Sequence, residues 1–236
     1  MATKLSNSPS THSKISVTIL TKNNASTIQK TLSSVEKFDE VVVVDTGSTD
    51  HTLEIAAQFD NVKIFHLPFT AFGPLHNQAS ALCKNDWVLS LDSDESLSCL
   101  LADEILSLTL EESCVYRMLR NNYFNQKHIR YCAGWYPDWI VRLYCRKKTS
   151  FSTDAVHEKI VTNHLKIISL KYPILHTPYK STADFLSKMQ HYSTLFAQQH
   201  AGKKKASFRG ALMHASHAFL KSYVFKGGFL GGKEGF

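Results

Sequence analysis

Residues Glu40–Asp50 read EVVVVDTGSTD and give the clearest indication of the fold. Four consecutive valines end at Asp45, and a turn with Gly47 follows. An unbroken run of β-branched residues is typical of a strand that is covered on both faces, as in a parallel sheet. The stretch therefore predicts a central parallel strand with Asp45 at its carboxyl end.

Strands and helices alternate around this central strand. The predicted strands span 15–20, 41–45, 62–67 and 86–96, and the predicted helices span 25–38, 48–59 and 77–84. This order predicts an α/β fold with a doubly wound, mostly parallel sheet flanked by helices. Ligands of such sheets bind beyond the carboxyl ends of the strands, where three polar clusters fall: 21–24, 45–50 and 92–95.

The second half of the chain has a different pattern. Segments 113–124 and 128–147 alternate in strand fashion around aromatic residues, and 183–200 and 207–225 have helical spacing. We expect a disordered lead at 1–13, an α/β domain at 14–178 with halves at about 14–98 and 99–178, and a helical, basic extension at 179–236.

Charge is concentrated at the carboxyl-terminal end of the chain. The segment 181–236 holds eight Lys or Arg and two acidic residues, so it carries +6 of the formal charge of +7. This excess of positive charge predicts an anionic partner. The candidates are a membrane surface, a lipid-linked substrate and a nucleic acid. The polar first residues lack the apolar block of a secretory signal, and the five cysteines form no CxxC pair, so we expect a cytoplasmic protein with reduced thiols and no zinc site.

The acidic cluster Asp92-Ser93-Asp94-Glu95 is the strongest chemical signal. On a regular strand Asp92 and Asp94 would point to the same side, and two close carboxylates need a cation or a shared proton between them. Carboxylates without a His or Cys partner favour Mg²⁺ or Mn²⁺, whose coordination is usually completed by phosphate oxygens and water. Two alternatives remain: a solvated turn that caps a helix, and an aspartyl nucleophile, which normally follows the first strand rather than the fourth.

Asp45 is placed to accept hydrogen bonds from a base N–H or a ribose hydroxyl, as an acid after a Rossmann strand does. Its alternative role is that of a turn residue. The sequence contains neither GxGxxG nor GxxxxGK[ST], which disfavours a dinucleotide-binding fold and a P-loop ATPase.

Five segments, 16–35, 40–52, 72–95, 134–146 and 156–160, together resemble family 2 glycosyltransferases of GT-A fold. More narrowly, they resemble the bacterial lipopolysaccharide-core β-1,4-glucosyltransferase group. The resemblance implies a metal-dependent, inverting transfer of a hexose, with UDP-glucose as the donor and a lipid-linked glycan as the acceptor, at the cytoplasmic face of the membrane. The residues implied to bind the nucleotide sugar are Thr21, Asn23, Asp45, Ser48, His76, Asn77, Asp92, Ser93 and Asp94.

The resemblance also implies the remaining roles. Asp92 and Asp94 would hold the metal, Glu158 would be the catalytic base with Asp138 as second choice, and Trp135, Tyr136 and Trp139 would shape the acceptor side. The alternatives are a surface ion pair for Glu158 and a place in the core for the tryptophans. The chain departs from the family pattern in two places: many relatives have Arg where this chain has His76, and many have Asp-Gly where it has Gly231-Gly232.

Three other functions fit parts of the sequence. A nucleic-acid-binding protein would use the basic tail but leaves Asp45, Asp92 and Asp94 unexplained. A nucleotidyltransferase would need a Gly-rich, basic loop after the first strand, where this chain has TKNNAS. A non-catalytic partner of glycosyltransferase type fits the departures at His76 and Gly231. Neither the oligomeric state nor the identity of the sugar can be predicted from the sequence.

Overall fold

The computed structural model describes residues 14–131, 135–153, 158–179, 181–202 and 207–235. They form two compact units, each made of two pieces of the chain: unit 1 takes the described residues of 14–118 and 141–172, and unit 2 takes those of 119–140 and 173–235. The predicted lead at 1–13 lies outside the described residues. The domain limits proposed from the sequence stay predictions.

A mixed, mostly parallel sheet forms the centre of unit 1, with neighbouring strands in the order β3-β2-β1-β4-β8-β6. β1 pairs in parallel with β2 and β4, and β2 pairs in parallel with β3, whereas β8 runs antiparallel to β4. The strands are β1 (Ile15–Thr21), β2 (Glu40–Asp45), β3 (Val62–His66), β4 (Trp87–Asp92), β5 (Glu95–Leu97), β6 (Cys114–Phe124), β8 (Trp139–Cys145) and β9 (Lys166–Ser169). The parallel strand predicted from the valine run is confirmed.

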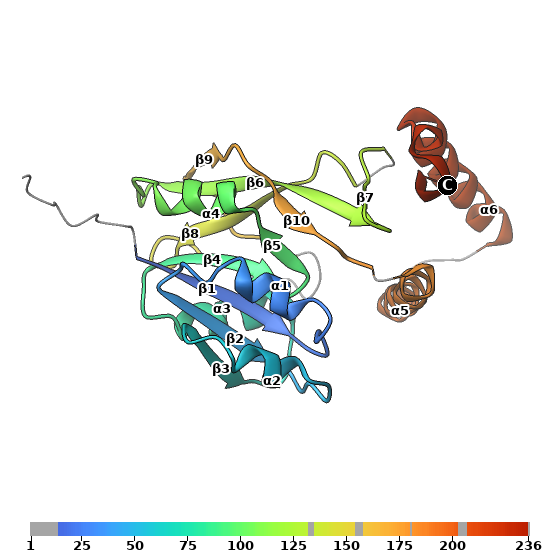
Figure 1. Cartoon of the computed structure of the whole chain (residues 1–236). Helices are drawn as coiled ribbons and strands as arrows, with labels where there is room; N and C mark the ends of the chain where they lie inside the picture. Colours follow the sequence, from blue (N-terminus) through green and yellow to red (C-terminus); the bar gives the residue numbers. More distant parts are fainter. Residues whose placement is uncertain (1–13, 132–134, 154–157, 180, 203–206, 236) are drawn as a thin grey trace, which may run out of the picture. The chain divides into compact units, whose positions relative to one another are not determined.

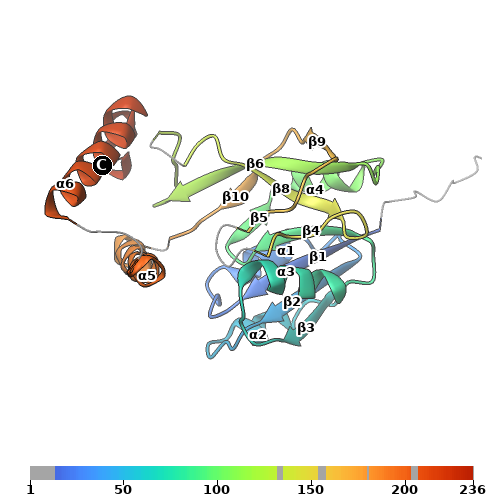
Figure 2. The ribbon, with the colours of Figure 1, turned by 180° about the vertical axis from the view of Figure 1, so that it is seen from behind.

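Helices cover both faces of the parallel strands in unit 1. Helices α1 and α2 lie on one face, and α3 lies on the opposite face (Figures 1 and 2). This is the doubly wound arrangement predicted from the order of the elements. The helices of this unit are α1 (Ile28–Ser33), α2 (Thr52–Ala56), α3 (Phe72–Ala81) and α4 (Cys99–Leu106).

The valine run is the centre of the core. All four valines are fully buried. Val42 and Val44 pack with Leu75 and Ala79 of α3, and because side chains alternate along a strand, Val41 and Val43 face the side of α1 and α2. Burying one such side chain contributes about 1.5–3 kcal/mol, so this strand fixes both layers of helices against the sheet.

Strand register brings the predicted polar clusters to one edge. Thr21 pairs with Asp45 between β1 and β2, and Leu20 pairs with Asp92 between β1 and β4. Since the three strands are parallel and adjacent, Thr21, Asp45 and Asp92 lie side by side at their carboxyl ends. The predicted convergence of the clusters 21–24, 45–50 and 92–95 is therefore confirmed.

Unit 2 contains the second half of β6, residues 119–124. There β6 pairs in parallel with β10 (Ile174–His176) and antiparallel with β7 (Lys127–His128). The other elements are α5 (Thr182–His200), α6 (Phe208–Phe219), the π-helix η1 (Leu220–Phe225) and the 3₁₀ segment η2 (Gly228–Gly235). Helices thus form in both segments where the sequence predicted them.

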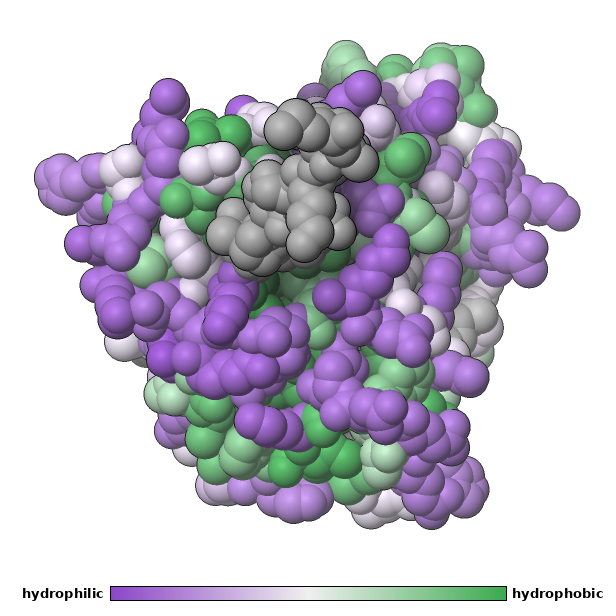
Figure 3. Space-filling model, turned by 60° about the vertical axis from the view of Figure 1, so that its left-hand side comes forward, coloured by the Kyte–Doolittle hydropathy of each residue, from purple (hydrophilic) through white to green (hydrophobic). Residues whose placement is uncertain are grey.

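The surface has the mixture of hydrophilic and hydrophobic side chains that is usual for a globular protein. The face drawn in Figure 3 is covered mainly by hydrophilic side chains, with hydrophobic ones showing in patches between them. Within the part of the chain that the structure describes, no helix combines the length and the hydropathy that crossing a bilayer requires.

Candidate active site

Two loops at the carboxyl edge of unit 1 are joined by side chains. Asn23 follows β1 with a φ of 56°, a left-handed conformation that asparagine tolerates. Its amide oxygen accepts from the N–H of Thr49 at 2.8 Å, and its own N–H donates to Ser48 Oγ at 3.0 Å. Asp50 in turn accepts from the N–H of Ala25 at 3.1 Å. The loop after β1 is therefore fixed to the loop after β2.

Asp45 is buried at this edge, with only 2% of its surface exposed. Its carboxylate accepts from the N–H of Gly47 at 3.0 Å, from the N–H of Ser48 at 3.1 Å and from Ser48 Oγ at 2.5 Å. His66 Nδ1 lies 3.4 Å from it. Burial by itself raises the pKa of Asp45, but the hydrogen bonds from Ser48 and Gly47 outweigh burial and hold this pKa below its ordinary value. A carboxylate stays at the edge of the sheet across the physiological pH range.

The acidic cluster does not continue as a regular strand. β4 ends at Asp92, Ser93 and Asp94 form a turn, and β5 begins at Glu95. The expectation that strand alternation puts Asp92 and Asp94 on one side is therefore wrong, because the turn breaks the alternation. Ser93 is buried, and its carbonyl accepts from Thr31 Oγ1 at 3.0 Å, which ties the turn to α1.

The positive charge that faces this cluster is a guanidinium of the chain itself. Arg142 of β8 is buried, and its Nη2 donates to Asp92 Oδ2 at 2.5 Å and to Glu95 Oε1 at 2.7 Å. Burial by itself lowers the pKa of Arg142, but the charges of Asp92 and Glu95 outweigh burial and raise this pKa above its ordinary value. Glu95 has no exposed surface, so it is a structural partner of Arg142.

Sequence reasoning missed Arg142, although a signal was present. In the segment WIVRLYC an arginine stands alone in an otherwise apolar strand. A buried arginine needs an anionic partner, because an unpaired charge in the interior costs several kcal/mol. The acid-rich turn after β4 was the available partner, and only the pairing of β4 with β8 brings the two together.

The donor chemistry at this turn fits a divalent cation only in part. Asp92 and Asp94 supply hard carboxylate oxygens, the ligands that Mg²⁺ and Mn²⁺ prefer. One oxygen of Asp92 is bonded to Arg142. Among the described residues no group of three or more His, Cys, Asp or Glu is placed to hold a metal ion. The residues thus fit a cation that takes one or two carboxylates from the protein and the rest of its ligands from a phosphate group and water.

His76 joins the acidic edge to Glu158. Its Nδ1 lies 3.2 Å from Ser90 Oγ of β4, and its Nε2 lies 4.0 Å from Glu158 Oε1. The ring is stacked on Phe151 with the centroids 4.3 Å apart. Burial lowers the pKa of His76 to about 4, more than the nearby Asp92 raises it. At neutral pH the imidazole is therefore uncharged and differs in this respect from an arginine, the residue that the resemblance implies at this position.

Asn77 bonds to the backbone of a segment that is distant along the chain. Its amide nitrogen donates to the carbonyl of Phe151 at 3.0 Å, and its amide oxygen accepts from the N–H of Phe151 at 2.8 Å. The predicted direct contact with a nucleotide sugar stays a prediction. What the geometry supports is that Asn77 holds the segment on which His76 stacks.

Sequence comparison identifies the family of the chain. The family described as Glycosyl transferase family 2 matches residues 16–99. A relative from Rickettsia felis, described as an uncharacterized glycosyltransferase, is 32% identical over 239 residues, which cover 94% of this chain and 83% of the relative. The chain belongs to glycosyltransferase family 2.

Other relatives of this glycosyltransferase extend the comparison. The lipopolysaccharide core biosynthesis glycosyltransferase LpsC of Rhizobium meliloti is 26% identical over 236 residues, 94% of this chain and 85% of LpsC. Among solved structures, S. aureus TarS 1-349 in complex with UDP-GlcNAc matches with a TM-score of 0.52 and 20% identity over 71% of this chain and 59% of that one. The mannosyltransferase PcManGT from Pyrobaculum calidifontis, in complex with GDP-Man and Mn²⁺, matches with a TM-score of 0.53 and 16% identity over 88% of this chain and 69% of that one.

The structural matches show the fold that this glycosyltransferase shares with GT-A-like proteins. The chain spans less than two thirds of the TarS structure that it matches. As a family 2 member, the chain is an enzyme of hexosyltransferase type that uses a nucleotide-sugar donor.

The predicted acceptor-side residues of this glycosyltransferase lie in the described part of unit 2. Asp138 Oδ2 accepts from Arg120 Nε at 2.7 Å and from Asn122 Nδ2 at 3.2 Å. Asn122 Nδ2 also donates to the carbonyl of Trp135 at 2.8 Å. Two residues of β6 thus hold Asp138 and the Trp135 loop together, and this makes Asp138 a positioning residue of the loop.

The aromatic side chains of this loop differ in exposure. Trp139 and Tyr136 are exposed, and Trp135 is partly buried, with its ring 5.9 Å from that of Tyr179. The alternative that both tryptophans belong to the core is therefore wrong for Trp139. An exposed indole beside a held carboxylate is a surface on which a sugar ring can stack.

Proposed function

We propose that this enzyme is an inverting, metal-dependent glucosyltransferase that takes glucose from UDP-glucose. The observation that carries the proposal is the gathering of two sets of side chains at one place in unit 1. Asp92 and Asp94 follow β4, and Glu158 stands 4.0 Å from His76, which contacts Ser90 two residues before Asp92. This series of contacts supports a base candidate near the carboxylates that we propose as metal ligands, although the residues are far apart in sequence.

The nucleoside would bind at the edge formed by β1 and β2. The Thr21 hydroxyl is buried and has no hydrogen-bond partner among the described residues. It lies beside Asp45 in the strand register, so a base edge or a ribose could bond to both. Asn23 and Ser48 would shape this pocket by holding its two loops together. The complex of TarS with UDP-GlcNAc supports a uridine nucleotide as donor.

The diphosphate would bind beside Asp94 and Asp92. A cation held there supplies charge compensation for the leaving diphosphate, a Lewis-acid contribution of several kcal/mol. The Mn²⁺ present with PcManGT supports this choice of metal. Because Arg142 already bonds to Asp92, we expect Asp94 to be the main protein ligand and Asp92 to be held in place for the ribose or the metal.

Glu158 would act as the general base. It would take the proton of the acceptor hydroxyl as that oxygen attacks the anomeric carbon, while the diphosphate leaves from the opposite face. General-base catalysis contributes about 10²–10⁴-fold in rate. We prefer Glu158 to Asp138 because Asp138 is bonded to Arg120 and Asn122, whereas Glu158 adjoins the acidic edge through an uncharged His76.

The acceptor would be a lipid-linked glycan, and lipopolysaccharide core is our first choice. The name of LpsC supports it. Trp135, Tyr136 and Trp139 would line the acceptor side, with Asp138 keeping their loop in place. We propose that the reaction takes place at the cytoplasmic face of the membrane.

Calorimetric titration of UDP, with Mn²⁺ and with a chelator, tests the donor site. We expect metal-dependent binding in the wild type and its loss in Asp94→Ala. Asp103→Ala, which removes an exposed carboxylate paired with Lys37, is the matched control and should bind like the wild type. Glu158→Gln should bind UDP normally and lose about 10²–10⁴-fold in turnover of UDP-glucose with the acceptor. UDP binding that is absent from the wild type, or unchanged in Asp94→Ala, would overturn the proposed donor site.

A further inference from the structure

The C-terminal helices of unit 2 expose large apolar side chains in one continuous segment. No residue of α6 or η1 is buried. Leu212 exposes 58% of its surface, and Phe225 exposes 80%. We name the C-terminal apolar face by its residues: Phe208, Leu212, Met213, Phe219, Leu220, Val224 and Phe225.

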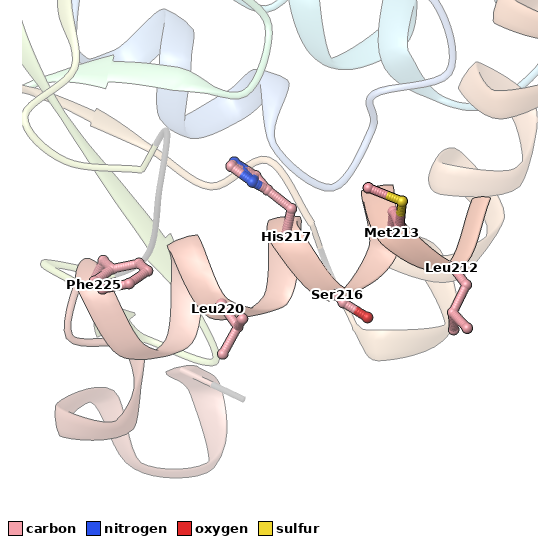
Figure 4. Close-up of a pocket in the computed structure, with 6 residues that line it drawn as sticks. All are labelled: Leu212, Met213, Ser216, His217, Leu220 and Phe225. Carbon is pink, nitrogen blue, oxygen red and sulfur yellow. The ribbon is translucent and has the colours of Figure 1, made fainter. Parts of the chain in front are cut away.

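The side chains of this face project from more than one side of the helix (Figure 4). Leu212, Ser216 and Leu220 are four residues apart and lie in a row along one side (Figure 4). Met213 and His217 point to another side of the helix (Figure 4), and together with Phe225 they line a pocket with the Leu212 row. His214 and Lys221 are placed by helical spacing on the side opposite Leu212. The segment is therefore amphipathic, with an apolar side wide enough to enter an apolar medium.

Charge on this segment has a single sign. Between Asp184 and Glu234 the sequence contains no acidic residue, and all eight Lys or Arg of the C-terminal segment fall within or at the ends of that interval. Arg209, Lys221 and Lys226 lie on or directly after α6 and η1. An apolar helix side flanked only by cations complements a surface that is apolar inside and anionic outside, which is the interface of an acidic lipid bilayer.

The segment that follows this face is fixed to the β6–β7 hairpin. Lys127 Nζ donates to the carbonyl of Gly231 at 2.5 Å and lies 3.2 Å from Glu234 Oε2. Gly228 leaves no room for a side chain, since a Cβ there would lie 2.9 Å from the carbonyl oxygens of Gly235 and Ser222. The same strand β6 carries Arg120 and Asn122, which hold Asp138 and Trp135. The segment after the apolar face and the acceptor-side loop are therefore both bonded to the β6–β7 hairpin.

We propose that the C-terminal apolar face is a docking surface for an anionic lipid bilayer. The inference deepens the proposed function, on which it rests for the lipid-linked acceptor. A second copy of the chain is disfavoured as the occupant, because two acid-free, cationic segments would repel each other. A nucleic acid is disfavoured because it would leave Leu212, Leu220 and Phe225 in water.

Co-sedimentation of the full chain with vesicles tests the surface. We expect binding to phosphatidylcholine vesicles that contain about one third phosphatidylglycerol, and weak binding to phosphatidylcholine alone. The double variant Leu212→Glu/Leu220→Glu should lose at least about tenfold in affinity, because it places anions in the apolar face. Leu100→Glu is the matched control, since Leu100 exposes 57% of its surface on α4 of unit 1, and its binding should not change.

Three results would overturn the docking surface: no binding to the acidic vesicles, equal loss in Leu100→Glu, or binding that DNA abolishes and the double variant does not affect. Circular dichroism and urea unfolding of both variants verify that they fold. Titration of UDP into the same proteins separates this inference from the proposed function. Unchanged UDP binding with lost vesicle binding supports the docking surface, and lost UDP binding in the wild type overturns the donor site instead.

Discussion

The carboxyl edge of unit 1 and the C-terminal helices of unit 2 both carry charged side chains, but only the edge pairs them within the protein. At the edge, Asp45, Glu95 and Arg142 are buried and bonded to other groups of the chain. On α6 and η1, cations and apolar side chains are exposed together, and no acid interrupts them. The first arrangement is preorganised for a small ligand, and the second offers a broad surface to a large partner.

The difference shows where each region obtains its stability. The edge depends on internal pairs, so the removal of one partner leaves a buried charge behind. The side chains of the apolar face are exposed, so substitutions there should alter binding to a partner far more than folding. Three changes test this contrast, beginning with the largest expected effect.

Arg142→Met should lower the free energy of unfolding by about 3–5 kcal/mol, because it leaves Asp92 and Glu95 close together without their common cation. Urea unfolding measures this loss. Arg142→Met/Glu95→Gln should recover much of it, since one of the two anions is gone. If the free energy of unfolding of the single variant lies within 0.5 kcal/mol of the wild-type value, internal ion pairing does not stabilise the edge. The edge would then not differ from the apolar face in the source of its stability.

A fall in pH should destabilise the protein through His76. The pKa of this group is about 4 in the folded state and near 6.5 when the chain is unfolded, so between these values only the unfolded chain takes up the proton. Stability is therefore complete above pH 6.5 and falls towards pH 4, by about 3 kcal/mol for this group. Urea unfolding at several pH values measures the slope, and His76→Asn should reduce it. An identical slope in the variant would assign the pH dependence to other groups.

Leu212→Ala should change the free energy of unfolding by less than about 0.5 kcal/mol, because Leu212 is exposed on α6. Leu75→Ala provides the contrast: Leu75 is buried in the core of unit 1, and its truncation should cost about 2–5 kcal/mol. Thermal or urea unfolding of both variants gives the comparison. A large loss in Leu212→Ala would show that α6 packs within the protein and is not an open surface.

Much of the candidate site could be read from the sequence because parallel strands impose a simple rule. Once the valine run is recognised as a buried parallel strand, Asp45 must lie at its carboxyl end, and the ends of neighbouring strands must share that edge. Asp92 followed in the same way from β4. The conformation after Asp92 could not be predicted, since a turn and a continuing strand are both compatible with the residues Ser93 and Asp94.

The side-chain partners were beyond the reach of the sequence. Asn77 is a residue type that often binds ligands, but here it bonds to the backbone of Phe151, which is 74 positions away in the chain. The low pKa of His76 depends on its burial under Phe151 and on the charges around it. Such contacts depend on which long-range segments meet, and local patterns contain no information about that.

Four features could be predicted from the residues alone: the α/β class, the parallel direction of the first strands, the edge at which the acids gather and the cationic character of the C-terminal segment. These follow from periodicity, composition and the geometry of strands, which are local properties. Only the tertiary structure decided that Arg142 is the cation between Asp92 and Glu95, that Asp138 is held by β6, and that Glu158 stands beside His76. Each of these pairs joins residues at least 16 positions apart, and the cost of burying a charge or a polar group without a partner is what selects them.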